Sequence, residues 1–333
     1  MSKSQPNLSK LLKKIAPKAG VKVILEPRYS RVGQMICPNG KIHYFRDNNF
    51  DLNPMGSSAI AVDKDYANYF MSKMGYPTIS GQAFYSEKLC KVLNSNEGIE
   101  KAFQYALHLG FPLIVKPNSK SQGKCVFMVN NKKEFYNTCL KVFKCDRVVL
   151  IQRFIPGKDY RIVVLDDEII SAYQRLPLAV IGDGVHTVLE LLNIKQSEFY
   201  SGGRTTKIDI NDCRIKMFLG NQKMKMNTIL KKNQYCQLLP NANLSSGGEA
   251  FDVTSTIHED FKKIAIKLTA AMGLRYCGVD IITEGDITDA PSKYWVIEIN
   301  SAPGIDNYFA IGKEQQKIVE KLYLKVLKAI AKQ

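Results

Sequence analysis

Apolar residues recur at helical spacing in several stretches of the chain. In residues 8–15, leucine and isoleucine lie three or four positions apart, which predicts a short amphipathic helix. The same pattern predicts helices over residues 63–74, 95–110, 132–144, 261–272 and 318–330. Asp63 is a suitable N-cap for the helix that follows it, and Gly75, Gly110 and Gly273 are suitable stops.

Short runs of valine, isoleucine and leucine between these helices predict strands. They cover residues 21–25, 41–45, 113–116, 125–129, 148–152, 278–282 and 295–300. Residues 160–165 and 169–173, joined by a polar turn, predict an antiparallel hairpin. Helices mixed with antiparallel strands indicate an α/β (α+β) chain, with a small α/β unit at its start and a compact strand–strand–helix–strand lobe over about 112–152.

Two of the apolar strands near the end of the chain carry carboxylates. Glu298 and Asn300 lie two residues apart, so their side chains point to the same side of the strand, and Asp280 lies in the strand before. A carboxylate among apolar neighbours is unfavourable unless it is paired or binds a metal. Oxygen ligands of this kind suit Mg²⁺. The alternative is a set of salt-bridged or surface-facing carboxylates.

Three loops have compositions that suit nucleotide binding. Residues 116–124 run from a strand-end lysine into a polar turn with glycine, whose N–H groups can hold phosphates although no Walker loop is present. Residues 152–159 follow a strand with exposed donors and acceptors, and residues 243–248 are rich in Asn, Ser and Gly. The alternatives are a solvated basic turn, an inter-domain hinge and an ordinary surface loop.

Composition and charge narrow the class of protein. The 333 residues are 45% hydrophobic and 23% charged, as in a soluble globular protein of two or three domains. No apolar run is long enough to span a membrane and no leader is recognised, and the eight scattered cysteines indicate reduced, mostly packing thiols in a cytoplasmic protein. The net charge of +16 favours acidic partners, but the lysines are spread along the chain, so a solvated basic surface is favoured over specific nucleic-acid binding.

Taken in order, these segments resemble the ATP-grasp ligases over residues 60–330. The similarity is closest to the ligase halves of cyanophycin synthetase and bifunctional glutathione synthetase, without the second catalytic domain of those proteins. It is carried by residues 63–64, 114–117, 152–161, 175–187, 243–248, 257–260, 277–280 and 298–300. The resemblance implies an ATP-grasp fold in which two lobes clasp ATP between antiparallel sheets. It divides the chain into an N-terminal substrate-side unit (1–60), a helical segment with the small lobe (61–155), and a C-terminal lobe with the metal and substrate site (156–333).

The activity implied is an ATP-dependent acid–amino-acid ligase. A substrate carboxylate would take the γ-phosphoryl group to form an acyl-phosphate, and an amine would then displace phosphate to give an amide. The cofactors would be ATP and Mg²⁺, with Mn²⁺ as an alternative. The partners would be small amino acids or short peptides, in a protein that dimerises as relatives do and binds neither membranes nor a specific nucleic acid.

Site roles follow from the same resemblance. Lys116 and Arg175 would act in catalysis, and Asp280, Glu298 and Asn300 would bind the metal. ATP would contact Lys64, Lys116, Ser119, Ser121, Gly123, Gln152, Arg153, Phe154, Ile155 and Asp159. The substrates would contact Arg161, Arg175, Asn243, Ser246, Gly247, Ser301 and Gly304, with a structural role as the alternative for Arg161.

One departure bears on the substrate. D-alanine–D-alanine ligases, which are also similar, carry an arginine two positions before the first metal carboxylate, whereas this chain has Gly278. A D-alanine–D-alanine-type ligase is therefore the less favoured enzyme, and a non-catalytic ATP-binding regulatory protein is the alternative outside that class. The sequence does not identify the carboxylate donor, the amine acceptor or the kind of product.

Overall fold

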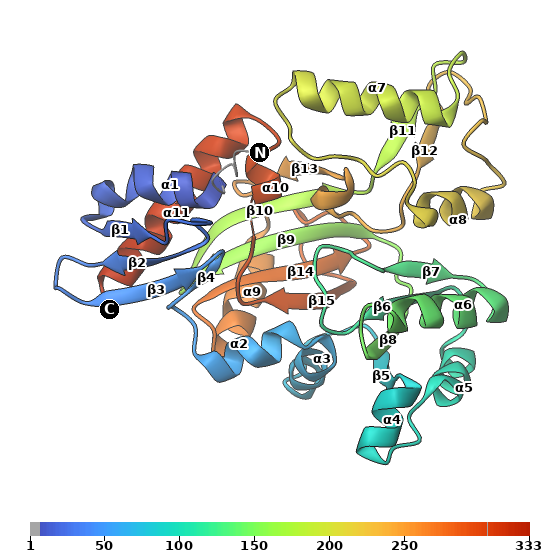
Figure 1. Cartoon of the computed structure of the whole chain (residues 1–333), viewed down its shortest axis with the longest axis horizontal. Helices are drawn as coiled ribbons and strands as arrows, with labels where there is room; N and C mark the ends of the chain where they lie inside the picture. Colours follow the sequence, from blue (N-terminus) through green and yellow to red (C-terminus); the bar gives the residue numbers. More distant parts are fainter. Residues whose placement is uncertain (1–6, 305) are drawn as a thin grey trace.

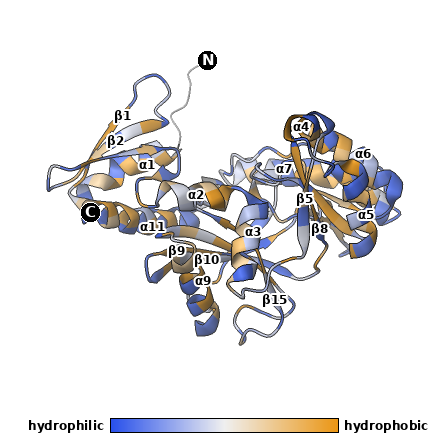
Figure 2. Cartoon of the chain, turned by 90° about the horizontal axis from the view of Figure 1, so that it is seen from below, coloured by the Kyte–Doolittle hydropathy of each residue, from blue (hydrophilic) through white to orange (hydrophobic). Residues whose placement is uncertain are grey.

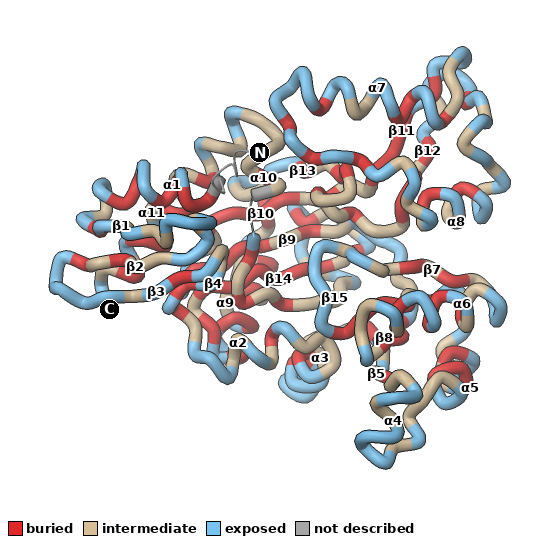
Figure 3. Tube along the Cα trace, in the orientation of Figure 1, coloured by how far each residue is buried: buried red, intermediate tan, exposed pale blue. Residues whose placement is uncertain are grey.

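A five-stranded antiparallel sheet forms the centre of the molecule in the computed structural model, which describes residues 7–304 and 306–333 (Figure 1). Its strand order is β13-β10-β9-β14-β15. The strands are β9 (Lys158–Leu165), β10 (Glu168–Leu176), β13 (Glu249–Asp252), β14 (Tyr276–Thr283) and β15 (Tyr294–Asn300). Most residues of β9, β10 and β14 are buried, as the red tube of Figure 3 shows, because both faces of the sheet are covered over most of their area.

Helices cover one face of this sheet. They are α2 (Met55–Val62), α3 (Lys64–Lys73) and α9 (Glu259–Ala271). Phe261, Ala265 and Leu268 of α9 pack in one core with Ile162 of β9 and Val279 of β14. The aliphatic residues of the central strands on this side therefore hold the sheet to its helices.

The opposite face is shared between a packed region and an open end. The packed region combines residues 7–52 with the C-terminal helices. Its elements are α1 (Asn7–Ile15), a 3-10 turn η1 (Ala16–Ala19), β1 (Lys22–Leu25), β2 (Val32–Ile36), β3 (Ile42–Arg46), β4 (Asn49–Phe50), α10 (Asp306–Phe309) and α11 (Lys313–Ala331). Leu12, Met35 and Val326 join Val163 of the central sheet in one core. The open end of the face carries polar side chains.

The small lobe is a four-stranded antiparallel sheet of order β5-β8-β6-β7, seen at the far end from the N-terminal sheet in Figure 2. It comprises β5 (Gly81–Tyr85), α4 (Glu87–Leu93), α5 (Ile99–Leu109), β6 (Leu113–Pro117), β7 (Phe127–Val129), α6 (Lys132–Phe143) and β8 (Val148–Arg153). Phe103 of α5 and Phe135 of α6 pack against Val115 and Ile151, so α5 and α6 close one side of the sheet.

A further substructure lies between β10 and β13 in the chain. It contains β11 (Ala179–Ile181), α7 (Val188–Ser201), α8 (Cys213–Asn221), β12 (Tyr235–Gln237) and the 3-10 turn η2 (Leu244–Ser246). Thr187 and Glu190 form a capping box at the start of α7. Leu192, Ile215 and Cys236 belong to its own core.

The predicted mixture of helices and antiparallel strands is confirmed. Each predicted helix and strand corresponds to an observed element; for example, the helix expected from Asp63 is α3, and the Asp63 side chain accepts hydrogen bonds from the N–H groups of Asp65 and Tyr66. The sequence did not predict β2, β4, β5, α2 or α4, nor any element of residues 178–250. Among the described residues, none of the helices combines the length and apolar character needed to cross a membrane.

Candidate functional site

A cleft of about 450 Å³ lies between the small-lobe sheet and the open end of the central sheet. The small lobe contributes β6, the end of β8 and the loop between β6 and β7, while the central sheet contributes β9, β10, β14 and β15. Most of the predicted site residues line this cleft: Lys64, Lys116, Ser121, Gly123, Gln152, Arg153, Phe154, Ile155, Asp159, Arg175, Asn243, Asp280 and Glu298.

Two lysines lie at the small-lobe side of the cleft. Lys116 is buried near the end of β6, where burial lowers its pKa to about 8 although the charge of Glu298 opposes the shift. Lys64 occupies the first turn of α3, directly after the capping Asp63. Its Nζ donates to the carbonyls of Asn118 (3.3 Å) and Lys120 (2.7 Å), so it holds the β6–β7 loop.

Two carboxylates face these lysines from the central sheet. Asp280 of β14 and Glu298 of β15 are direct cross-strand partners, and Glu298 lies 3.7 Å from Lys64 Nζ. Burial would raise the pKa of Glu298, but Lys64, Lys116 and Arg161 outweigh it and lower the pKa to about 2. Glu298 is therefore ionised at neutral pH, in a position to balance cations.

Asp280 is held by two arginines. Arg161 of β9 donates to both of its oxygens, at 2.6 and 2.7 Å, and Arg175 of β10 lies 3.0 Å from Oδ2. Arg175 also donates to Asp159, with Nη2 at 2.6 Å. Asp280 is therefore paired with Arg161 and Arg175, and both guanidinium groups lie at the candidate metal ligands.

Gly278 makes room for this arrangement. A Cβ atom there would lie 3.0 Å from Cβ of Pro303 and 3.6 Å from Nε of Arg161. The guanidinium group beside Asp280 therefore comes from β9, and the position two residues before Asp280 stays small.

Positive charge dominates the lining of the cleft. Six basic residues line it, against three acidic ones. The basic residues are Lys64, Lys116, Lys120, Arg153, Lys158 and Arg175, and the acidic ones are Asp159, Asp280 and Glu298. Such an excess, in a partly enclosed site, attracts a polyanion such as a triphosphate.

The donor set suits a hard divalent cation. Asp280 and Glu298 offer carboxylate oxygens across adjacent strands, and Asn300, whose Nδ2 lies 3.4 Å from Glu298 Oε1, offers an amide oxygen beside them. Within residues 7–304 and 306–333 there is no group of three His, Cys, Asp or Glu that would form a complete metal cage. This combination fits a metal that takes further ligands from a bound phosphate.

Apolar side chains form the part of the cleft beside the β8–β9 connection. Ile114, Val126, Ile282 and Ile297 line it together with Arg153, Phe154 and Ile155. Gly157 brings this connection against β14, because a Cβ there would lie 2.6 Å from Ile282 Cγ2. An apolar slot of this kind is suited to a planar base.

The β6–β7 loop reaches across the cleft. Ser245 Oγ donates to the carbonyl of Gln122 (3.1 Å), and Arg214 donates to that of Gly123. Gly123 has a left-handed φ of 66°, and a Cβ there would lie 2.2 Å from Oδ1 of Asn243, so glycine is favoured at this approach. The two loops singled out in the sequence therefore meet over the cleft.

Some predicted site residues lie outside the cleft lining. They are Ser119, Arg161, Ser246, Gly247, Asn300, Ser301 and Gly304. The N–H and Oγ of Ser119 donate to Asp146, and Ser301 Oγ donates to the carbonyl of Ser58 at 3.4 Å. Conversely, the cleft is also lined by residues that the sequence did not predict, among them Gln174, Gln237 and Asn241. Gln237 and Asn241 belong to a stretch in which apolar residues show no helical or strand periodicity.

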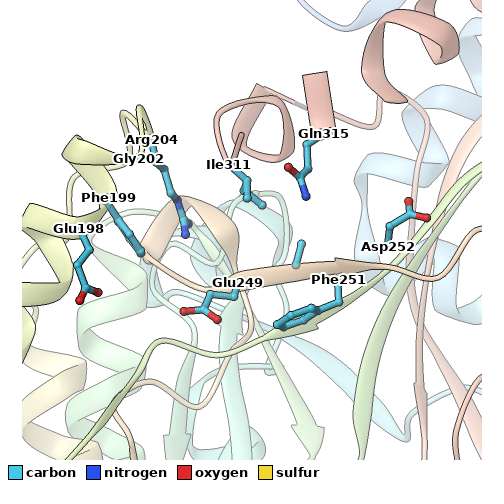
Figure 4. Close-up of a pocket in the computed structure, with 10 residues that line it drawn as sticks. Glu198, Phe199, Gly202, Arg204, Glu249, Phe251, Asp252, Ile311 and Gln315 are labelled. Carbon is cyan, nitrogen blue, oxygen red and sulfur yellow. The ribbon is translucent and has the colours of Figure 1, made fainter. Parts of the chain in front are cut away.

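A second hollow, of about 400 Å³, lies between the end of α7, β13 and the start of α11 (Figure 4). Its lining includes the carboxylates Glu198, Glu249 and Asp252 but a single cation, Arg204. Arg204 donates to the carbonyls of Leu244 and Gly248, so its charge is engaged by the loop at residues 243–248. This hollow is thus less suited to phosphate than the first cleft.

The chain matches the RimK-like ATP-grasp domain over residues 87–229 and 240–322, and it belongs to that family. The match covers most of the cleft-forming elements, including β6, β14 and β15. The prediction of an ATP-grasp fold is confirmed.

Individual relatives agree with this assignment. The glutathione biosynthesis bifunctional protein GshAB of Listeria welshimeri is 34% identical over 218 residues, which are 63% of this chain and 28% of that protein. The GshAB protein of Enterococcus faecalis is 36% identical over 202 residues, 58% of this chain and 27% of that protein. A crystal structure of a bifunctional glutathione synthetase from Pasteurella multocida superimposes with a TM-score of 0.59 at 26% identity, covering 97% of this chain and 45% of that one. The chain therefore spans less than half the length of each of these relatives.

Proposed function

We propose that this chain is an ATP-dependent ligase that joins a carboxylate to an amine through an acyl-phosphate, releasing ADP and phosphate. The observation that carries the proposal is one cleft in which Lys64 and Lys116 face Asp280 and Glu298 beneath a glycine-containing loop. Family membership supports it, since the relatives with a stated activity are synthetases that form amide bonds.

The two lysines would bind the phosphates of ATP. Lys116 is buried and Lys64 is anchored on the β6–β7 loop, so both charges are already in place before a triphosphate binds. Charge that is fixed in advance stabilises the dispersed negative charge of phosphoryl transfer without reorganisation. Asp280, Glu298 and Asn300 would hold Mg²⁺, which would neutralise part of the triphosphate's negative charge.

Arg175 would orient the carboxylate substrate. Its guanidinium group lies within hydrogen-bond distance of both Asp159 and Asp280, and its side chain is 8% exposed. It is therefore a rigidly held cation beside the proposed metal ligands. A bidentate guanidinium group suits a carboxylate or the acyl-phosphate formed from it. The loop contact between Gly123 and Asn243 would exclude water from that intermediate.

The substrates are proposed as amino acids or short peptides, because the relatives are named for glutathione biosynthesis. A cytoplasmic location remains a prediction from the scattered cysteines, and a homodimer remains a prediction from the resemblance. A D-alanine–D-alanine-type ligase is disfavoured, since Arg161 and Pro303 fill the space that a side chain at position 278 would need. A non-catalytic ATP-binding protein is separated from the enzyme by the assay below.

The test is release of ADP and phosphate in the presence of ATP, Mg²⁺ and paired amino acids and short peptides, with mass spectrometry of condensed products. We expect release to depend on one carboxylate donor and one amine acceptor and to yield an amide one water lighter than the pair. Tight ATP binding without release for any pair would favour the non-catalytic alternative.

Glu298→Gln is the matched variant. It keeps the side-chain shape and removes the charge that faces Lys64 and Lys116, so we expect turnover to be lost while the thermal transition is kept. The control is Glu284→Gln, which makes the same change at an exposed residue paired only with Lys293. Equal turnover in the two variants would remove the proposed role of Glu298.

A further inference from the structure

Two cysteines from separate segments of the small lobe lie in direct contact. The Sγ atoms of Cys125 and Cys145 are 3.0 Å apart, and both residues are half-buried. Among the described residues, no other two cysteine sulfurs lie within hydrogen-bond distance of each other.

This pair lies at the base of the loop that covers the cleft. Cys125 is the residue at which the β6–β7 loop returns toward β7, and its backbone is left-handed, with a φ of 57°. Cys145 lies in the turn between α6 and β8, next to Asp146, which accepts hydrogen bonds from Ser119. The loop is therefore held on the same turn at its start, by Ser119, and at its end, by Cys125.

We propose that Cys125 and Cys145 are an oxidation site, where a hydroperoxide converts the two thiols into an intramolecular disulfide. The Cys125 thiolate attacks one peroxide oxygen, the O–O bond breaks, and the departing oxygen takes a proton to leave as water or alcohol. The resulting sulfenic acid is then attacked by the Cys145 sulfur, the S–O bond breaks, and a second water leaves with the Cys145 proton. Two thiols lose two electrons and two protons, and one peroxide is reduced.

The surroundings assign the two roles. Burial and the contact with Cys125 raise the pKa of Cys145 to about 11, and its Sγ donates to the carbonyl of Val142 at 3.1 Å. Cys145 is therefore a thiol at neutral pH and a poor nucleophile toward peroxide in solution, whereas its Sγ lies 3.0 Å from the sulfur of Cys125 and is in place for the second step. Cys125, on the loop, takes the first step.

The disulfide would fasten the end of the loop to the small lobe. The tip of the same loop contacts Ser245 and Arg214 on the other side of the cleft. A covalent link at Cys125 leaves fewer residues free to move when the loop opens. We expect small molecules to enter and leave the cleft of the oxidised protein more slowly. We also expect the loop to resist tryptic cleavage after its basic residues, Lys120 and Lys124.

The experiment uses the full chain, reduced, freed of reductant and treated with hydrogen peroxide. Peptide mapping without reductant should recover one cross-linked peptide containing Cys125 and Cys145, two hydrogen atoms lighter than its parts. Cys125→Ser and Cys145→Ser should each abolish it, whereas Cys213→Ser, at an exposed cysteine, should leave it unchanged. Circular dichroism confirms that each variant is folded, and the wild-type result alone decides the pairing. Absence of the cross-link in the wild-type protein, or oxidation to unpaired sulfinic acids, would overturn the proposal.

Limited trypsin digestion measures the effect on the loop. Cleavage after Lys120 and Lys124 should be several-fold slower in the oxidised protein and should recover with dithiothreitol, while Cys145→Ser should show no dependence on peroxide. A cross-linked protein that is cut as fast as the reduced one would refute the fastening of the loop. None of these readouts depends on ligase activity, so the proposed function and this proposal fail separately.

Discussion

Replacing Arg204 by alanine should destabilise the protein and loosen the loop at residues 243–248. Arg204 is 5% exposed, and its Nη2 donates to the carbonyls of Leu244 (3.0 Å) and Gly248 (2.6 Å) at the two ends of that loop. Its guanidinium carbon lies 3.9 Å from the centre of the Phe199 ring. Burial lowers its pKa to about 10, so the side chain still carries its charge at neutral pH.

The size of the effect follows from these contacts. A buried carbonyl that loses its donor is destabilised by about 1–3 kcal/mol, and two carbonyls are affected. The stacking on Phe199 contributes about 1 kcal/mol more. If the loop relaxes, water can hydrogen-bond to the two carbonyls, which favours the lower end of the range for each. We therefore expect the free energy of unfolding to fall by roughly 3–4 kcal/mol. A domain stable by about 5–15 kcal/mol tolerates that loss and remains folded.

Urea denaturation followed by circular dichroism measures this loss. Phe199→Leu keeps both hydrogen bonds of Arg204 but removes the ring that contacts Arg204 and Lys195, so it should lose about 1–2 kcal/mol and is the matched control. In the proposed ligase assay, Arg204→Ala should raise the KM for the carboxylate substrate more than the KM for ATP, because the loop borders the cleft at Asn243. A loss below about 1 kcal/mol would show that these hydrogen bonds are replaced by water without effect.

Two further predictions concern other charged pairs. Arg175→Ala should strongly reduce acyl-phosphate formation while ATP affinity, measured by calorimetry, stays within a few-fold; a collapse of ATP affinity would place Arg175 in the nucleotide site instead. The hydrogen bond that the His186 ring donates to the Asp183 carboxylate raises the pKa of His186, so the protonated form is favoured in the folded state and this contribution is lost as pH rises through that pKa. Asp183→Asn should return the pKa of His186 towards its ordinary value of about 6.5 in an NMR titration, and an unchanged pKa would contradict the pairing.

Regular hydrophobic patterns made the larger elements predictable. The apolar stripe at residues 8–15 forms α1, because its helical spacing gives one apolar face that must be buried. The short aliphatic runs around Val163 and Val279 form central strands, because residues that are apolar on both sides fit a sheet covered on both faces. In contrast, β2 was not predicted, because it contains Gly33, a residue type that is depleted in strands. That glycine is required because a Cβ would lie 2.4 Å from the carbonyl of Ile24 on the neighbouring strand. The close approach of two strands depends on the tertiary structure and cannot be predicted from the local sequence pattern.

The candidate site was predictable to a similar extent. The alternation of side chains on β15 and the strand-end position of Lys116 placed Glu298 and Lys116 where the cleft lies. The positions of Gln237 and Asn241 depend on how residues 178–250 fold against the loop, and no periodicity marks them. The pairing of Asp280 with Arg161 depends on the register between β14 and β9, which the sequence leaves undetermined.

That pairing leads to a prediction about the metal. Both oxygens of Asp280 accept from Arg161, and Arg175 lies 3.0 Å from one of them, so a cation binding there alone must replace strong charge-assisted hydrogen bonds. A triphosphate offers the guanidinium and ammonium groups other acceptors and offers the cation more oxygen ligands. We therefore expect Mn²⁺ to bind weakly by electron paramagnetic resonance in the absence of nucleotide, and about tenfold or more tightly with a non-hydrolysable ATP analogue. Asp280→Asn should abolish that coupling, whereas Mn²⁺ affinity that is equal with and without the analogue would show that Arg161 and Arg175 do not compete for Asp280.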